Sequence, residues 1–363
     1  MLRESSRVTT NDNGRSILTE LDINGDGITD REVSREIGDD GTLTVTEQNL
    51  DTNGGLISGR VTVTSDDGLL TTTAYDRDGN GFDELIVETL RTLNADGSIT
   101  EVTSEMGKPL SVFSQTQVTT SDDGLQTTEQ QDWNNDGVVD LTIVDEMSFA
   151  ADGSETRSIV RTAADASTLS IATISTSADR RLVTDSFDAD GNGNNDRITT
   201  TTVADSGIST VENTWFSTGG AVIATAVIET SANGLNETRT VDRNGDGEAE
   251  RIVTSETTLG QDGSVTRTIE HRDYLNILHA SERYVRSDDG LATSSQIDLD
   301  GDGSFDFYTT DETSYESDGD TVRTQVTLNQ YDDLRSRIDT RVSGDGLSTT
   351  VETDYTGNGT INR

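Results

Sequence analysis

The stretch GLATSSQIDLDGDGSFD, residues 290–306, contains the two patterns that decide the fold of this chain. Its first half, residues 290–297, opens with a Gly-Leu step and continues with short polar and apolar residues, which is typical of a strand. Its second half, residues 298–306, is an acidic loop with glycine at its sixth position. Similar strands begin at Gly68, Gly124, Gly234 and Gly346.

The acidic loop occurs seven times at nearly constant spacing. Successive first aspartates are separated by 54 or 56 residues, and we number the loops 1 to 7 in chain order: 22–30, 76–84, 132–140, 188–196, 242–250, 298–306 and 354–362. A fixed period of this length indicates one repeat array over residues 1–363. The sequence stops directly after loop 7, where a strand should follow, so we expect a fragment of a longer protein.

Each repeat divides into four strand-like segments. In the second repeat these begin at Gly68, Phe82, Ser98 and Leu110, and a tight Asp-Gly turn, NADGS from Asn94, separates the second from the third. Asp-Gly between β-branched segments is a strong hairpin signal. We therefore predict an all-β fold of tandem four-stranded antiparallel meanders, each about 55 residues long.

The arrangement of the repeats has two possible forms. Along the first strand, Leu69, Thr71, Thr73 and Tyr75 share one face, which is apolar only at its ends. Such a face suits an elongated sheet or β-spiral, because a propeller blade needs apolar residues on both faces. A β-propeller of about seven blades is the alternative, since four-stranded units repeat about seven times.

Composition limits the classes of partner. The formal net charge is −42 and hydrophobic residues make up 30% of the chain. Such acidity favours cations and disfavours nucleic acid and anionic membrane surfaces. We expect no membrane insertion, because no apolar run approaches the length of a spanning helix. The chain has no cysteine, so an extracellular array needs another stabilising element, for which metal is the natural candidate.

The loops have the donor pattern of a calcium site. Ca²⁺ takes about 6–8 oxygen ligands, and carboxylates or amides at positions one, three, five and nine, plus the carbonyl of position seven, supply most of them. The predicted ligands are Asp22, Asn24, Asp26, Ile28 and Asp30; Asp76, Asp78, Asn80, Phe82 and Glu84; Asp132, Asn134, Asp136, Val138 and Asp140; Asp188, Asp190, Asn192, Asn194 and Asp196; Asp242, Asn244, Asp246, Glu248 and Glu250; and Asp298, Asp300, Asp302, Ser304 and Asp306.

The loops differ in charge. Loop 6 has four carboxylates at these positions and should bind calcium most tightly. Loop 7 offers Asp354, Thr356, Asn358 and Asn362, with one carboxylate, and should bind most weakly or not at all.

These loops resemble the DxDxDG calcium loop shared by EF-hands and the strand-loop-strand sites of integrin-type (FG-GAP) repeats. EF-hands close the site with Glu at position twelve, whereas loops 1, 2 and 6 have Val33, Val87 and Thr309 there. The strand-loop-strand version is therefore the nearer relative. Across the chain, the alternation of strands, acidic loops and Asp-Gly turns resembles the arrays of large secreted bacterial calcium-binding proteins of the repeats-in-toxin or adhesin kind. That resemblance implies a secreted or cell-surface setting.

The sequence contains few residues that could carry out catalysis. His271 and His279 are the only histidines, which is too few for a zinc site, and a nucleophilic triad has no members. We expect a non-enzymatic, extracellular, calcium-stabilised spacer or adhesive stalk that contacts cell-surface or matrix components. Its calcium affinities should lie near roughly 10⁻⁴–10⁻³ M. The alternatives are a lectin- or receptor-like propeller braced by calcium and an accessory region of a secreted polysaccharide-acting enzyme.

Overall fold

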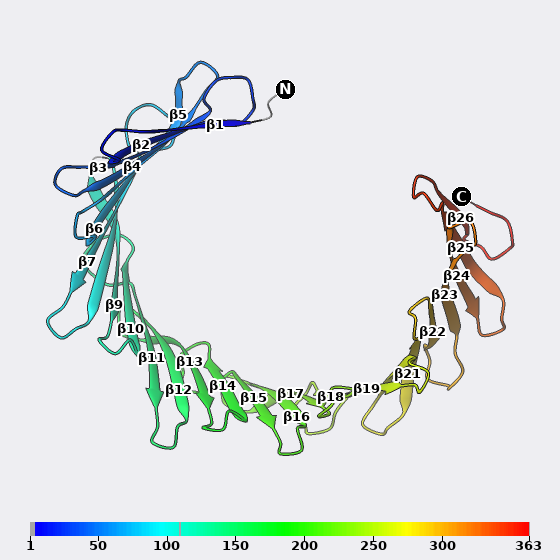
Figure 1. Cartoon of the computed structure of the whole chain (residues 1–363). Helices are drawn as coiled ribbons and strands as arrows, with labels where there is room; N and C mark the ends of the chain where they lie inside the picture. The colour runs from blue at the N-terminus through cyan, green and yellow to red at the C-terminus, as the bar shows by residue number, and fades with distance from the viewer. Residues whose placement is uncertain (1–3, 109, 363) are drawn as a thin grey trace. The chain divides into compact units, whose positions relative to one another are not determined.

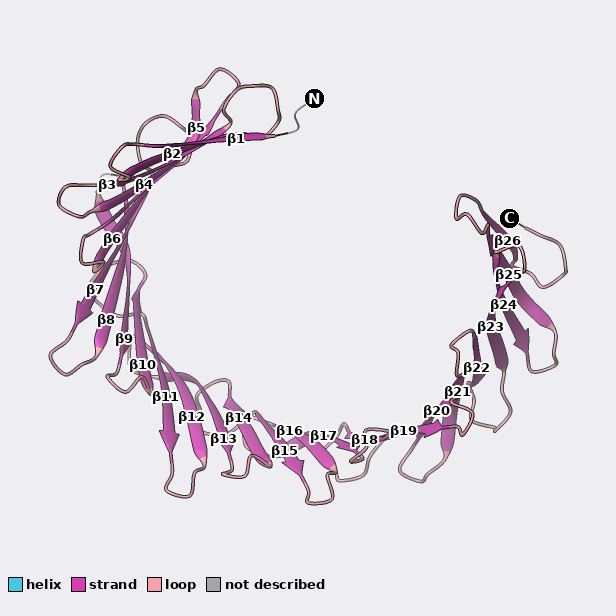
Figure 2. Cartoon of the chain, viewed as in Figure 1, coloured by secondary structure: helices cyan, strands magenta, loops and turns pink. Residues whose placement is uncertain are grey.

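The computed structural model describes residues 4–108 and 110–362, and all regular structure in these ranges is β-strand (Figures 1 and 2). None of the described residues forms a helix that could cross a membrane. The first thirteen strands are β1 Ser5–Thr10, β2 Ser16–Asp22, β3 Arg31–Ile37, β4 Leu43–Leu50, β5 Leu56–Thr64, β6 Leu70–Asp76, β7 Leu85–Leu93, β8 Ile99–Gly107, β9 Ser111–Thr120, β10 Gln126–Asp132, β11 Leu141–Phe149, β12 Glu155–Ala163 and β13 Thr168–Thr176.

The remaining described strands continue the same four-strand period. They are β14 Leu182–Asp188, β15 Arg197–Val203, β16 Ser209–Phe216, β17 Val222–Thr230, β18 Asn236–Asp242, β19 Arg251–Leu259, β20 Val265–Arg272, β21 Leu278–Arg286, β22 Ala292–Asp298, β23 Phe307–Tyr315, β24 Thr321–Asn329, β25 Leu334–Val342 and β26 Thr349–Asp354. Each acidic loop follows the first strand of a repeat, so the expected all-β class and four-stranded unit are confirmed.

Among the strand starts expected in the second repeat, that of the second strand differs most from the structure. In the second repeat β7 begins at Leu85, three residues after Phe82. Residues 82–84 belong to loop 2, because the amide of Glu84 donates to the carbonyl of Tyr75 at 2.8 Å and closes the loop. The loop therefore extends through its ninth residue before the second strand starts.

The chain divides into two units, which we describe separately. Unit 1 comprises Met1–Ala151, Glu155–Thr173 and Ala189–Asn192, and unit 2 comprises Asp152–Ser154, Ile174–Asp188 and Gly193–Arg363. In unit 1 consecutive strands from β1 up to β12 pair antiparallel. In unit 2 the strands β14 to β26 do the same. The expectation of a single array stays a prediction.

Hydrogen bonding passes from one repeat to the next within each unit. The fourth strand of the second repeat, β9, pairs with the first strand of the third repeat, β10, from Thr120↔Thr127 to Gln115↔Asp132. In unit 2, β17 and β18 are paired in the same way. Propeller blades are separate sheets, so the propeller alternative is wrong for these units and the continuous sheet is confirmed.

The sheet has almost no apolar core. Ala226 is the one buried hydrophobic residue in the described part of the chain. The solvent-accessible surface is 22241 Å², against about 14,000 Å² for a compact monomer of this mass. Ladder hydrogen bonds and cross-strand pairs such as Thr62–Thr73, whose hydroxyls are 3.2 Å apart, replace core packing.

Several of the most deeply buried residues are acidic. Asp298 is fully buried, and Asp76, Asp242 and Asp354 are 7%, 5% and 2% exposed. Each of them is the first residue of an acidic loop. A carboxylate is costly to bury without compensating hydrogen bonds or a counterion. The first aspartate of each of these loops therefore needs such partners.

Candidate metal sites

Loop 6 is organised around the buried side chain of Asp298, the last residue of β22. Its Oδ1 accepts the amide of Gly301 at 2.7 Å, and its Oδ2 accepts the amide of Gly303 at 3.0 Å. Gly303 has φ of +86°, a conformation in which glycine avoids steric strain. Glycine at position six therefore lets the backbone turn its amide toward the first aspartate.

The other side chains of loop 6 hold its backbone in the same way. Asp300 accepts the amide of Asp302 at 3.2 Å, and Asp302 accepts the amide of Ser304 at 2.7 Å. Asp306 accepts the amide of Leu299 at 2.8 Å, which joins the ninth position to the second. These bonds use one lone pair of each oxygen and leave others able to coordinate a cation.

This hydrogen-bond set recurs along the chain. In all seven loops the amide of the glycine at position six donates to the first aspartate at 2.7–3.0 Å. In loops 1, 2, 3 and 5 the side chain at position nine likewise accepts the amide at position two, at 2.6–2.8 Å. A simple turn does not need this arrangement of alternate acceptors.

In three loops, each of which lies wholly inside one of the two units, the carboxylates are close enough together to bind one metal ion. Each member of a group offers an oxygen, and these oxygens lie within 4.8 Å of one another. The groups are Asp76, Asp78 and Glu84 in loop 2; Asp242, Asp246 and Glu250 in loop 5; and Asp298, Asp300 and Asp302 in loop 6. Hard cations with oxygen ligands suit such sites.

The remaining predicted ligands are arranged differently. Among the described residues, loops 1 and 3 form no such group, and both combine Asn at position three, Asn24 and Asn134, with the shorter Asp at position nine. In loop 6, Asp306 is not part of the group. Residues of loop 4 are divided between the two units. The predicted carbonyl ligands at position seven and the weak binding of loop 7 stay predictions.

Backbone hydrogen bonds lower the pKa of two acids at these sites. Burial raises the pKa of Asp242, but the amides of Gly247, Gly245 and Asn244 outweigh it, so its pKa lies below the ordinary value. The amide of Arg77 lowers the pKa of Glu84 in loop 2, against opposing burial and with help from Lys108. In both carboxylates the hydrogen bonds therefore favour the charged form, which attracts a cation.

Position four of the loops has a role that sequence reasoning missed. A Cβ on Gly79, Gly301 or Gly357 would collide with the carbonyl at the start of the preceding strand, from Leu56, Leu278 or Leu334. Loop 3 has Asn135 instead, and its Nδ2 donates to the corresponding carbonyl, that of Val112, at 3.3 Å. Each of these loops thus rests on the previous repeat. The signal was glycine at position four in six of the seven loops.

Comparisons with known proteins identify no family. No family model matches the chain, and no curated protein matches it. Among solved structures, the crystal structure of TcdB2-TccC3 aligns over 98% of this chain at 10% identity and a TM-score of 0.18. The Photorhabdus luminescens Tc holotoxin pore aligns over 94% at 10% identity and a TM-score of 0.14. This chain spans 29% and 25% of those chains. Neither likeness carries an argument about fold or function.

Proposed function

We propose that the chain is a non-enzymatic, extracellular calcium-binding β-repeat array. Its acidic loops bind Ca²⁺, and the bound ions stabilise the strands on either side. The array acts as a structural spacer or adhesive stalk of a secreted or surface protein of the repeats-in-toxin or adhesin kind, and its partners are cell-surface or matrix components.

The single observation that supports this most strongly is the gathering of carboxylates beside a buried aspartate. In loop 6, Asp298 is fully buried and lies with Asp300 and Asp302 in one group. Like charges at this separation repel one another, and a divalent cation removes the repulsion. Because the sheet has little apolar burial, neutralising each loop adds a large share of the stability of its repeat.

Calcium is favoured over magnesium by the chemistry of the loops. Their donors are oxygens from carboxylates and amides on a flexible nine-residue segment. Ca²⁺ accepts irregular coordination by about 6–8 oxygens, whereas Mg²⁺ demands a smaller octahedral shell and keeps its waters. The missing acid at position twelve supports the weak affinity typical of extracellular modules.

Isothermal titration of the full chain with calcium tests the proposal, with magnesium as the competing ion. We expect saturable binding with dissociation constants of roughly 10⁻⁴–10⁻³ M and much weaker binding of magnesium. Equilibrium dialysis should count several ions per chain. Absence of bound calcium at millimolar concentration would refute the proposal.

A further inference from the structure

Three arginines in unit 2 line one hollow in the sheet. Arg239 lies in β18, Arg243 directly follows this strand, and Arg251 begins β19. Val241 is opposite Arg251 and Arg239 is opposite Val253, so the alternation of side chains places Arg239 and Arg251 on the same side. Arg243 lines the same hollow as these two arginines. His271 of β20 is also opposite Val253 and joins that face.

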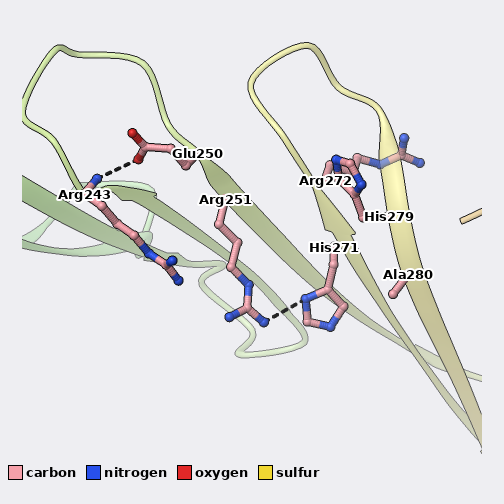
Figure 3. A pocket seen from close by; sticks show the side chains of 7 residues that line it. All are labelled: Arg243, Glu250, Arg251, His271, Arg272, His279 and Ala280. Atoms are coloured by element: carbon pink, nitrogen blue, oxygen red, sulfur yellow. Dashed lines mark hydrogen bonds between the residues drawn. The ribbon is translucent and has the colours of Figure 1, made fainter. Parts of the chain in front are cut away.

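A cavity of about 420 Å³ lies beside these residues. Its lining includes Arg243, Arg251 and His271 (Figure 3). A second cavity of about 400 Å³ is lined by Arg239, and Arg243 and Arg251 line both. Both hollows are open to solvent, so a small ligand or one unit of a polymer can reach the arginines. The face is therefore hollowed beside these basic side chains.

Equivalent arginines in other repeats are neutralised. In the first repeat, Arg31 pairs with Glu47 at 2.8 Å. Glu47 is opposite Val33, two residues after the arginine, and His271 has the same relation to Arg251. The acid of the first repeat is thus replaced by a histidine, whose Nδ1 accepts a hydrogen bond from Arg251 Nη2 at 3.0 Å.

The fourth repeat uses another position for its counterion. Arg197 pairs with Asp185 at 3.4 Å, and Asp185 is opposite Thr199. The equivalent position in the fifth repeat is Arg239, opposite Val253. In the fifth repeat the two positions that supply a carboxylate elsewhere are Arg239 and His271, so Arg251 has neither counterion.

The three guanidinium groups form no ion pair with another described residue, in a chain of net charge −42. Neighbouring basic side chains, in contrast, have acidic partners. Arg272 pairs with Glu270 at 3.0 Å, and His279 contacts Asp273 at 3.1 Å. Two acids border the region, Glu250 in the first cavity and Glu237 in the second. Glu250 accepts the backbone amide of Arg243, which leaves the guanidinium of Arg243 available.

We propose that Arg239, Arg243 and Arg251, together with His271, form a binding site for an oxyanion. Planar guanidinium groups recognise carboxylate and sulfate by paired hydrogen bonds, and several on one face favour a ligand with more than one acidic group. The ligand is a sulfated or carboxylated group, which can come from a free ion or from an acidic polysaccharide.

Titration of the calcium-loaded full chain with inorganic sulfate and with a sulfated hexasaccharide tests this site. We expect saturable binding, tighter for the hexasaccharide if the source is a polymer and equal per sulfate if it is a free ion. Arg243→Gln and Arg251→Gln should each weaken binding about tenfold, the loss expected for a charged hydrogen bond. His271→Glu should abolish binding by recreating the neutralised arrangement of the first repeat.

Arg197→Gln is the matched control, because it removes the same charge from the equivalent position of a repeat whose arginine is already paired. It should change affinity less than about twofold, within the scatter of exposed substitutions. Wild-type protein that does not bind either probe would overturn the proposal. So would an equal loss of binding in Arg197→Gln, because it would show general charge attraction rather than a site.

Discussion

A Cβ atom on Gly245 would lie 2.5 Å from the carbonyl oxygen of Val222. Gly245 occupies position four of loop 5, and Val222 begins β17, the last strand of the preceding repeat. The candidate metal loop is therefore seated against the backbone of its neighbour. Order in one loop is thus linked to the position of the adjacent repeat, as expected where each repeat contacts only the next.

Gly245→Ala should destabilise the fifth repeat more than Gly247→Ala. Both glycines have positive φ, which costs an alanine about 1–2 kcal/mol. A Cβ on Gly247 meets nothing within 4 Å, whereas Gly245→Ala adds a backbone clash worth about 1–3 kcal/mol more. Hydrogen exchange of β17 and β18 measures the difference. Equal protection of these amides from exchange in the two variants would mean that the close approach of Gly245 to Val222 does not affect stability.

Asp298→Asn should remove one tightly bound calcium ion. The change keeps the shape of the side chain but removes a charge from the loop with the most carboxylates at donor positions, so loop 6 should bind calcium at least about tenfold more weakly. Native mass spectrometry across a calcium titration counts the ions. Asp318→Asn, in an exposed hairpin turn, removes the same charge and should leave the count unchanged. Loss of an ion in both variants would contradict a specific site.

Asn135→Ala should weaken the docking of loop 3. Asn135 has φ of +53°, and its side-chain bond to Val112 replaces the close approach that glycine allows in the other loops. Losing that bond while keeping the strained conformation should cost about 1 kcal/mol. Asn135→Gly, which relieves the strain, should cost less. Urea unfolding of the two variants compares them, and the reverse order would count against this role of the side chain.

Acid should weaken the hairpin turns as well as the metal loops. The hydroxyl of Ser98, followed by its amide, lowers the pKa of Asp96 in the turn between β7 and β8. A lowered pKa in the folded state adds stability above the unfolded value near about 3.9, and this stability is lost as pH falls through the folded value. In Ser98→Ala the pKa of Asp96 should rise. Carboxyl NMR titration reports it, and an unchanged pKa would argue against the hydroxyl.

Much of this structure could be predicted because its determinants are local. Alternating Thr and Val residues and Asp-Gly turns specify hairpins within one repeat. The loop spacing likewise places Asp298, Asp300 and Asp302 together, because nine consecutive residues contain all the donors.

Features that depend on the neighbouring repeat could not be predicted in the same way. Contact between Gly245 and Val222 joins residues that only the strand pairing brings together. The propeller alternative stayed open because continuity of pairing from β9 to β10 is a property of two repeats. The same holds for Arg239, Arg251 and His271, whose common face follows from the register of three strands.

The most direct test of the central claim is thermal unfolding of the full chain, followed by circular dichroism, first in chelator and then in millimolar calcium. At calcium about tenfold above the dissociation constant, each occupied site should add about 1.4 kcal/mol. We therefore predict a weak or absent β-sheet transition in chelator and a transition many degrees higher in calcium. An identical melting curve in both conditions would show that the acidic loops are only turns and would contradict a calcium-stabilised array.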